Sequence, residues 1–224
     1  MISRDKEDST QGLFLAAKAG HNEESHNHND VGSFIIFKHG HPAIIDVGGA
    51  TYTSNYGNEW VRESAFHNLV PVINGQGQPN GKKYSAKNVG YSLMAGEAVF
   101  SQDLAGAYGE ETGVKKWERK FRHEKGESII ISDSYEFDAP PRSIVLPMML
   151  NAAPDISSAG EVIVTSGSTA RLTVTYDPEQ FDVEYEEINI EDKKISRNWS
   201  DKLYRLHFKI RKPSEKGSYD FVIR

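Results

Sequence analysis

Short apolar runs separated by turn-forming residues recur along almost the whole chain, and they constrain its fold more than any other feature. The runs are rich in β-branched and aromatic residues, as β-strands are. They cover Leu13–Ala16, Ser33–Phe37, Ala43–Val47, Leu69–Ile73, Ile129–Ile131, Ile144–Leu146, Val162–Thr165, Ala170–Tyr176 and Leu203–Ile210. No long helical pattern lies between them. The chain is therefore predicted to be all-β, a large antiparallel, supersandwich-like β-sandwich of many short strands, with residues 1–224 forming one domain.

Four segments call for individual predictions. Val114–His123 fits helical and strand periodicity, and strand is favoured because its surroundings are strand. Asn58–Phe66 is predicted as a short helix capped by Asn58. The glycine-rich, acidic Gln102–Gly113 is predicted as a long surface loop. Lys38–His41 is predicted as a hairpin turn, in which Gly40 supplies the positive φ that such turns need.

Composition excludes several functional classes. The chain of 224 residues has a formal charge of −6 and no cysteine. The negative charge argues against general attraction to nucleic acid or anionic lipid, and no apolar run is long enough for a membrane span. Any metal must use histidine, carboxylate or water, because thiolates are absent. The polar first residues lack the apolar core of a signal peptide, so the chain is either cytoplasmic or a piece of a longer protein.

The densest histidine cluster reads HNEESHNHND, at residues 21–30. In an extended segment, His26 and His28 would face the same side and could share a metal or a substrate. The hairpin at Gly40 would set Asp46 opposite residue 34, from where its carboxylate can approach the cluster. His67 opens a further β run. His28, Asp46 and His67 thus form a candidate metal set of two imidazoles and one carboxylate, which suits zinc.

These residues also have ordinary structural interpretations. A histidine near a strand end is usually a surface or hydrogen-bonded side chain, and no compact motif such as HExxH is present. Asp46, followed by Val47-Gly48-Gly49, could equally form a turn. The tryptophans could form a sugar-stacking platform, although burial is the commoner outcome; they are Trp60, Trp117 and Trp199. The remaining histidines are predicted to be turn, exposed or structural residues: His21, His39, His41, His123 and His207.

Three separated blocks resemble the C-terminal region of the heparinase II/III-like polysaccharide lyases, a family that includes related alginate lyases. The blocks are SHNHNDVGSFIIF at Ser25–Phe37, PAIIDVGGATYT at Pro42–Thr53 and AFHNLVPVINGQGQ at Ala65–Gln78. The resemblance implies a two-domain lyase in which this chain is the C-terminal β-sandwich, while the N-terminal α/α toroid that completes the cleft is absent. It also implies that His28, Asp46 and His67 bind one structural zinc ion, while His26 projects toward the substrate.

The implied chemistry is β-elimination on an acidic, uronate-containing polysaccharide, such as a glycosaminoglycan or alginate. Among nearby polar residues, Asn22 and Asn29 are predicted to face the substrate, with Gln76 and Gln78 as weaker candidates. The isolated chain should have little or no activity, because the missing helical domain supplies the other catalytic groups. The resemblance suggests a periplasmic, cell-surface or secreted parent protein.

Two other functional classes remain open. A non-catalytic carbohydrate-binding or interaction module would use the same sandwich without needing His26. A metal-dependent hydrolase would use His28, Asp46 and His67 with an activated water, and would release saturated products.

Overall fold

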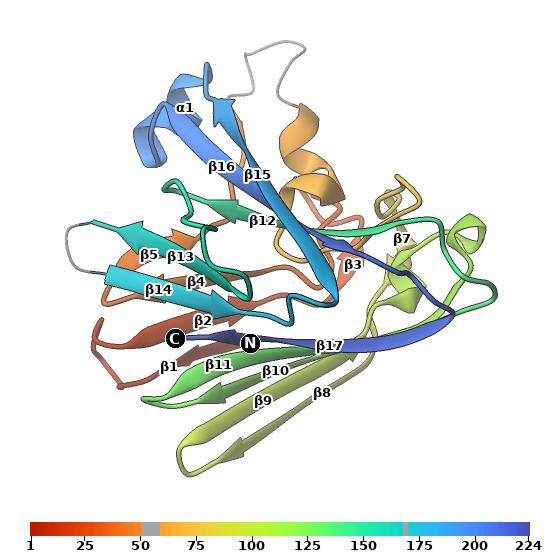
Figure 1. The fold of residues 1–224 in the computed structure, drawn as a ribbon, viewed down its shortest axis with the longest axis horizontal. Coiled ribbons are helices and arrows are strands. Elements are labelled where there is room, and N and C mark those ends of the chain that lie inside the picture. Colours follow the sequence, from red (N-terminus) through yellow and green to blue (C-terminus); the bar gives the residue numbers. More distant parts are fainter. Residues whose placement is uncertain (51–58, 168–169) are drawn as a thin grey trace.

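Two large antiparallel sheets face each other across a shared core in the computed structural model, which describes residues 1–50, 59–167 and 170–224 (Figure 1). The predicted all-β sandwich is confirmed. Asn58, the predicted helix cap, lies outside the described residues. The part of the sequence that follows it, Glu59–Phe66, forms two 3₁₀ turns, η1 and η2, in place of the predicted helix.

One sheet has eight strands and the other has seven. The eight-stranded sheet runs β1 (Ile2–Arg4), β2 (Leu13–Ala17), β4 (Phe34–Lys38), β5 (His41–Ile44), β12 (Ile144–Leu150), β16 (Lys202–Ile210) and β15 (Phe181–Asn189), with β6 (Val72–Ile73) paired to β12. The seven-stranded sheet runs β13 (Glu161–Ser166), β14 (Ala170–Thr175), β17 (Lys216–Ile223), β11 (Ser128–Phe137), β10 (Val114–Glu124), β9 (Glu97–Asp103) and β8 (Lys87–Met94).

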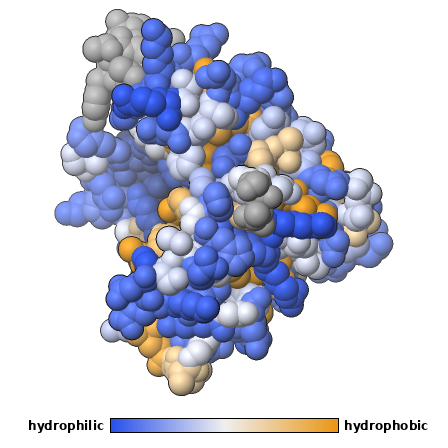
Figure 2. Space-filling view, turned by 90° about the vertical axis from the view of Figure 1, so that its left-hand side faces the viewer, coloured by the Kyte–Doolittle hydropathy of each residue, from blue (hydrophilic) through white to orange (hydrophobic). Residues whose placement is uncertain are grey.

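The remaining elements are small. A two-stranded ribbon joins β3 (His21–Asn22) to β7 (Gly81–Ser85). The helical elements among the described residues are η1 (Glu59–Arg62), η2 (Ser64–Phe66), η3 (Ala105–Ala107), η4 (Glu110–Thr112) and α1 (Lys193–Asn198). None of the helices in this part of the chain has the length and apolar character needed to cross a membrane. The face shown in Figure 2 is largely hydrophilic, with hydrophobic residues in scattered patches, one of which lies at its lower end.

The main core lies between the two sheets and follows strand alternation. In β10, predicted correctly as a strand, Trp117, Arg119, Phe121 and His123 all point inward and are fully buried. A smaller apolar cluster, which includes Ile45, Met149 and Leu203, lies apart from this core. Val61 of η1 and Ile195 of α1 belong to that second cluster, so η1 and α1 pack together beside the eight-stranded sheet.

The predicted hairpin at Lys38–His41 is confirmed. His39 and Gly40 have φ values of 52° and 80°, as a tight turn between twisted strands requires. Ile36 pairs with Ile44, which is the register expected if the turn is centred on Gly40. The end of β5 therefore lies beside the start of β4. The loop between β3 and β4, which carries His26 and His28 and is called the histidine loop below, joins the sheet at this point.

Two further predictions need correction. The strand predicted at Leu69–Ile73 is reduced to Val72–Ile73, because Leu69 has a φ of 52° that breaks the extended backbone. Gln102–Gly113 is not an open surface loop, since it begins in β9, contains η3 and η4, and buries Leu104 and Tyr108. Trp117 is fully buried, which is the outcome that the sequence favoured for a tryptophan, and it is therefore excluded from a sugar-stacking platform.

A buried polar triad fastens β1 to the opposite sheet. His123 is fully buried; its Nε2 lies 2.8 Å from Asp5 Oδ1 and its Nδ1 lies 2.8 Å from Ser3 Oγ. Because an ionised carboxylate only accepts, a neutral His123 donates from Nε2 to Asp5 and accepts the Ser3 hydroxyl proton at Nδ1. Burial lowers the pKa of His123, against the attraction of Asp5.

We expect this triad to make stability depend on pH. Below about pH 6.5, His123 is protonated in the unfolded chain but stays neutral in the folded chain, because its pKa is lower there. The free energy of unfolding therefore falls by up to about 1.4 kcal/mol for each pH unit of acidification. His123→Gln should be less stable than the unchanged chain at pH 7, yet lose less stability between pH 7 and pH 5, as measured by urea unfolding. Equal losses on acidification in the two proteins would contradict this assignment.

Candidate functional site

Three separate segments bring His28, Asp46 and His67 together at one end of the sandwich. His28 lies in the loop between β3 and β4, Asp46 follows β5, and His67 follows η2. One potential ligand atom from each residue lies within 4.8 Å of the others. The sequence-predicted metal set is therefore assembled in space, although its members are up to 39 positions apart in the sequence (67 − 28).

Asp46 forms the turn that the sequence allowed, and its carboxylate also faces the histidines. Its Oδ1 accepts a 2.8 Å hydrogen bond from the Gly48 backbone N–H, which forms a local turn. Its Oδ2 lies 2.9 Å from His67 Nδ1. The turn therefore orients the carboxylate, so that the second oxygen faces the histidines.

The two histidines have donor atoms that suit a metal ion. Their rings lie side by side, with centroids 5.2 Å apart. His67 is fully buried. Its Nδ1 is engaged with Asp46, whereas its Nε2 has no hydrogen-bond partner among the residues that the structure describes. Leaving a buried polar atom unsatisfied costs about 1–3 kcal/mol. A bound ion would satisfy such a nitrogen, and two imidazoles with one carboxylate are a donor set that zinc accepts.

The electrostatics of the cluster favour the protonation states that a metal requires. Burial lowers the pKa of His28, and the neighbouring charge of His67 lowers it further. Burial alone would raise the pKa of Asp46, but the hydrogen bond and charge of His67, with the Gly48 N–H, lower it overall. At neutral pH His28 is therefore neutral and Asp46 ionised, which are the forms that coordinate metals.

His26 lies in the same loop but in a different environment. It is exposed and has a φ of 60°, in a turn that follows the end of β3. His26 and His28 therefore do not share a face through strand alternation, as was predicted, because the loop is not extended. Their separation arises from this turn, with His28 half-buried in the cluster and His26 at the surface.

The predicted substrate-facing amides lie in contrasting positions. Asn22 is completely buried, so its side chain is not accessible to a ligand from the surface. Its Nδ2 donates to Gln78 Oε1 at 3.0 Å. Asn29 is half-buried and accepts from Asn27 Nδ2 at 3.2 Å. Gln76 is exposed, whereas Gln78 is only 4% exposed. Asn29 and Gln76 remain accessible for a ligand, while Asn22 and Gln78 form part of the loop's support.

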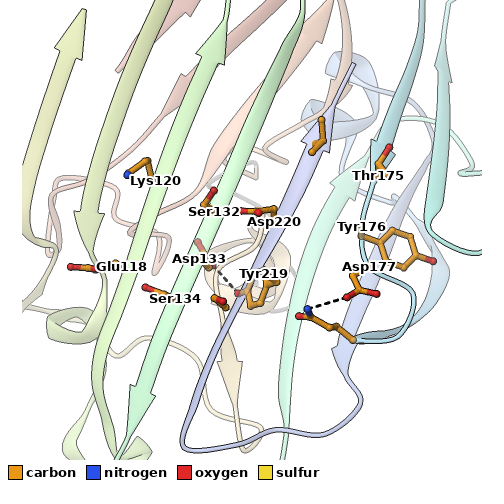
Figure 3. Close-up of a pocket in the computed structure, with 13 residues that line it drawn as sticks. Glu118, Lys120, Ser132, Asp133, Ser134, Thr175, Tyr176, Asp177, Tyr219 and Asp220 are labelled. Carbon is orange, nitrogen blue, oxygen red and sulfur yellow. Dashed lines mark hydrogen bonds between the residues drawn. The ribbon is translucent and has the colours of Figure 1, made fainter.

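Two concave regions differ in their relation to this cluster. A groove of about 270 Å³ includes Lys18, Asp30 and Asp46 in its lining, and Lys18 Nζ pairs with Asp30 Oδ1 at 2.6 Å. A second groove, of about 600 Å³, is lined by residues of β10, β11, β14 and β17 on the other sheet (Figure 3). Of these two grooves, only the smaller one adjoins the histidine cluster, because Asp46 is part of its lining. The larger groove contains no residue of the cluster in its lining.

Asn68, which the sequence did not identify, fixes the three strands behind the cluster. Its Nδ2 donates to the carbonyl oxygens of Phe34, at 2.5 Å, and Ile45, at 2.8 Å, and its Oδ1 accepts from Met149 N–H at 2.7 Å. Because Asn68 follows His67 and Ile45 precedes Asp46, this one side chain couples both ligand-bearing segments. Its position next to a candidate ligand was the only available sequence signal.

Comparisons with known proteins agree with the fold. A family model described as "Heparinase II/III-like, C-terminal" matches residues 3–212. No curated protein matches the chain. Similar solved structures include heparan sulfate lyase HepC from Pedobacter heparinus, with a TM-score of 0.72, 17% identity, and coverage of 94% of this chain and 32% of that chain. A structure titled "Crystal Structure of Heparinase III" has a TM-score of 0.69, 16% identity, and coverage of 100% and 36%.

These likenesses bear on architecture, not on activity. The identities are low, so the solved structures support the shared fold alone. The chain spans about a third of the length of each solved structure just described.

Proposed function

Because the chain belongs to the heparinase II/III-like C-terminal family, we propose that it is the β-sandwich part of a polysaccharide lyase that cleaves uronate-containing polysaccharides by β-elimination. The observation that carries this proposal is the convergence of His28, Asp46 and His67 within 4.8 Å, with His26 exposed on the same loop. We propose heparan sulfate as the first substrate to test, because similar structures are titled as heparinase III and heparan sulfate lyase.

In this proposal, metal binding and substrate contact are assigned to different histidines. His28, Asp46 and His67 hold one zinc ion, which ties the loop after β3 to the segments after β5 and η2. His26 faces the sugar and carries out one of the two proton transfers of the elimination. In that reaction a base removes the C5 proton, the C4–C5 double bond forms as the C4–O bond breaks, and an acid protonates the departing glycosidic oxygen. The remaining catalytic groups come from an N-terminal helical domain of an exported parent protein.

Two lysines next to the histidine loop are candidate partners for an acidic ligand. Exposed Lys82 and Lys83 lie at the start of β7, which pairs with β3 beside the loop. The Lys82 backbone N–H donates to Glu23 Oε2 at 2.8 Å, which holds this basic strand near the residues that precede His26. The loop also carries exposed Glu23 and Glu24, so Lys82 and Lys83 would act as individual ion-pair partners for carboxylate or sulfate groups of a uronate polymer, not through a net positive charge.

We expect the unchanged chain to bind about one zinc ion, and His28→Ala and Asp46→Ala to lose that binding by a factor of at least about ten. Zinc should also raise the melting temperature of the unchanged chain, because a ligand at 100 times its Kd stabilises the folded state by about 2.7 kcal/mol. Elemental analysis after dialysis, and thermal melts with and without zinc, provide the measurements.

His26→Ala is the matched control, since it removes a neighbouring imidazole from outside the metal set. It should retain zinc and the zinc-dependent melting shift. Unchanged metal content in the His28 and Asp46 variants would refute the zinc assignment. The lyase assignment has its own test, which is whether the full-length protein containing this domain releases 4,5-unsaturated uronides from heparan sulfate.

A further inference from the structure

The loop that carries His26 and His28 has almost no regular structure of its own. β3 ends at Asn22 and β4 begins at Phe34, so the intervening residues are held by contacts with other parts of the chain. A loop without strand pairing places its side chains accurately only if its backbone polar groups are fixed elsewhere. The buried residues that fix it therefore determine where His28 lies.

Gln78 provides the main anchor at both ends of this loop. Its Nε2 donates to the Val31 carbonyl oxygen at 2.8 Å, and its Oε1 accepts from the Val31 N–H at 3.0 Å. The same Oε1 accepts from Asn22 Nδ2 at 3.0 Å. One buried amide thus holds the residue that ends β3 and a residue three positions after His28.

Ser64 connects this anchor to the segment that carries His67. Its hydroxyl accepts from the Gln78 backbone N–H at 2.8 Å and donates to the Asn29 carbonyl oxygen at 2.7 Å. Ser64 is 2% exposed and lies three positions before His67. The contacts therefore run from Asn29, the neighbour of His28, through Ser64 to the His67 segment.

Close packing at Gly77 supports the same connection independently. A Cβ atom added at Gly77 would lie 2.8 Å from Ser64 Cβ and 2.9 Å from Ser64 Oγ. Both distances are shorter than real Cβ contacts. Glycine at this position is what allows the Gln78 backbone to approach the Ser64 hydroxyl.

We propose that Gln78 and Ser64 are positioning residues that set the spacing between His28 and His67, and so determine the affinity and geometry of the metal site. This inference rests on the proposed metal binding by those histidines. It assigns Gln78 to the support of the site, in place of the weak substrate-facing role predicted from sequence. The matched residue is Gln76, which is exposed, has the same side chain and lies two positions away.

The test is cobalt titration of the chain, because Co²⁺ accepts the same ligands as zinc and its visible spectrum reports coordination geometry. Gln78→Ala and the milder Ser64→Ala should each weaken Co²⁺ binding by about 10–100-fold and alter the visible spectrum of the bound ion. Gly77→Ala should change both readouts in the same direction. Gln76→Ala should match the unchanged chain in both.

The possible outcomes distinguish the positioning role of Gln78 and Ser64 from the proposed metal binding on which it rests. If the unchanged chain binds Co²⁺ and the Gln78 and Ser64 variants bind it with equal affinity and an identical spectrum, the positioning role is wrong while the metal site stands. The inference is also overturned if the Gln78 and Ser64 variants melt at a lower temperature than the unchanged chain in the presence of chelator but bind cobalt as the unchanged chain does. That result would mean that the two residues stabilise the fold without positioning the histidines. If the unchanged chain binds no Co²⁺ and no zinc, both proposals fail.

Discussion

Replacing Asp133 by alanine should lower the free energy of unfolding by about 3–5 kcal/mol, because the Arg119 guanidinium would be left buried without its counter-charge. The side chains of Asp133 and Arg119 are both completely buried. Asp133 Oδ1 accepts from Arg119 Nε at 2.8 Å, and Oδ2 accepts a second bond from the same guanidinium. Trp117 Nε1 also donates to Oδ2, at 2.9 Å. The Tyr219 hydroxyl donates to the same oxygen at 2.8 Å (Figure 3).

The measurement is urea unfolding of the chain, with Asp220→Ala as the matched control. Asp220 lies next to Tyr219 on β17 but is exposed, so its loss should change stability by no more than about 0.5 kcal/mol. If Asp133→Ala fails to fold, the double variant Arg119→Met/Asp133→Leu should restore folding, because it removes both charges together. A decrease in the free energy of unfolding of less than about 1 kcal/mol for Asp133→Ala would show that the Arg119–Asp133 pair does not stabilise the core.

The Arg119 network marks a limit of what strand periodicity can predict. Alternation in β10 places Arg119 on the same face as Trp117 and Phe121, so the parity was readable from the sequence. Whether that face could hold a charge depended on Asp133, in β11, which lies opposite Arg119. Pairing of that kind depends on tertiary register, which local sequence does not contain.

Strand β8 shows a different failure of pattern reading. Its residues are almost all exposed, including Tyr91 at 80% and Leu93 at 72%. Val89, Tyr91 and Leu93 alternate with Gly90 and Ser92, so the period-two pattern of a strand is present in the sequence. Alternation therefore predicts a strand here, but not that its apolar face is exposed, because exposure depends on whether another layer covers this edge of the sheet.

The candidate site was predictable where a hairpin fixed the register, and not where the chain left regular structure. The turn at Gly40 sufficed to predict that Asp46 approaches the histidines, and the structure groups Asp46 with His28 and His67. The orientation of His26 could not be deduced in this way, because its positive φ lies outside the strand geometry on which the argument depended. An amide such as Gln78 can serve a ligand or the fold equally well, and only its burial distinguishes the two.

Replacing His26 by alanine in the full-length protein should reduce kcat by about 10²–10⁴-fold, the usual contribution of a positioned proton-transfer group. The change in KM should be small, because most of the contacts with a long polymer are made elsewhere. The rate of appearance of the ultraviolet absorbance of the 4,5-unsaturated uronide, with heparan sulfate as substrate, gives both constants. Zinc content should be unchanged, since His26 is outside the cluster of His28, Asp46 and His67.

The control is His39→Ala, at the exposed turn between β4 and β5, which should leave turnover unchanged. His26→Gln should be as inactive as His26→Ala, because an amide can hydrogen-bond to the sugar but cannot exchange a proton at neutral pH. Full activity in either His26 variant would remove the histidine from the reaction. Cleavage that yields only saturated products would favour hydrolysis, and binding of the polymer without cleavage would favour a carbohydrate-binding module. If His26 transfers a proton, both His26→Ala and His26→Gln must lose β-elimination while they keep the metal. Neither a hydrolase nor a carbohydrate-binding module would give that result.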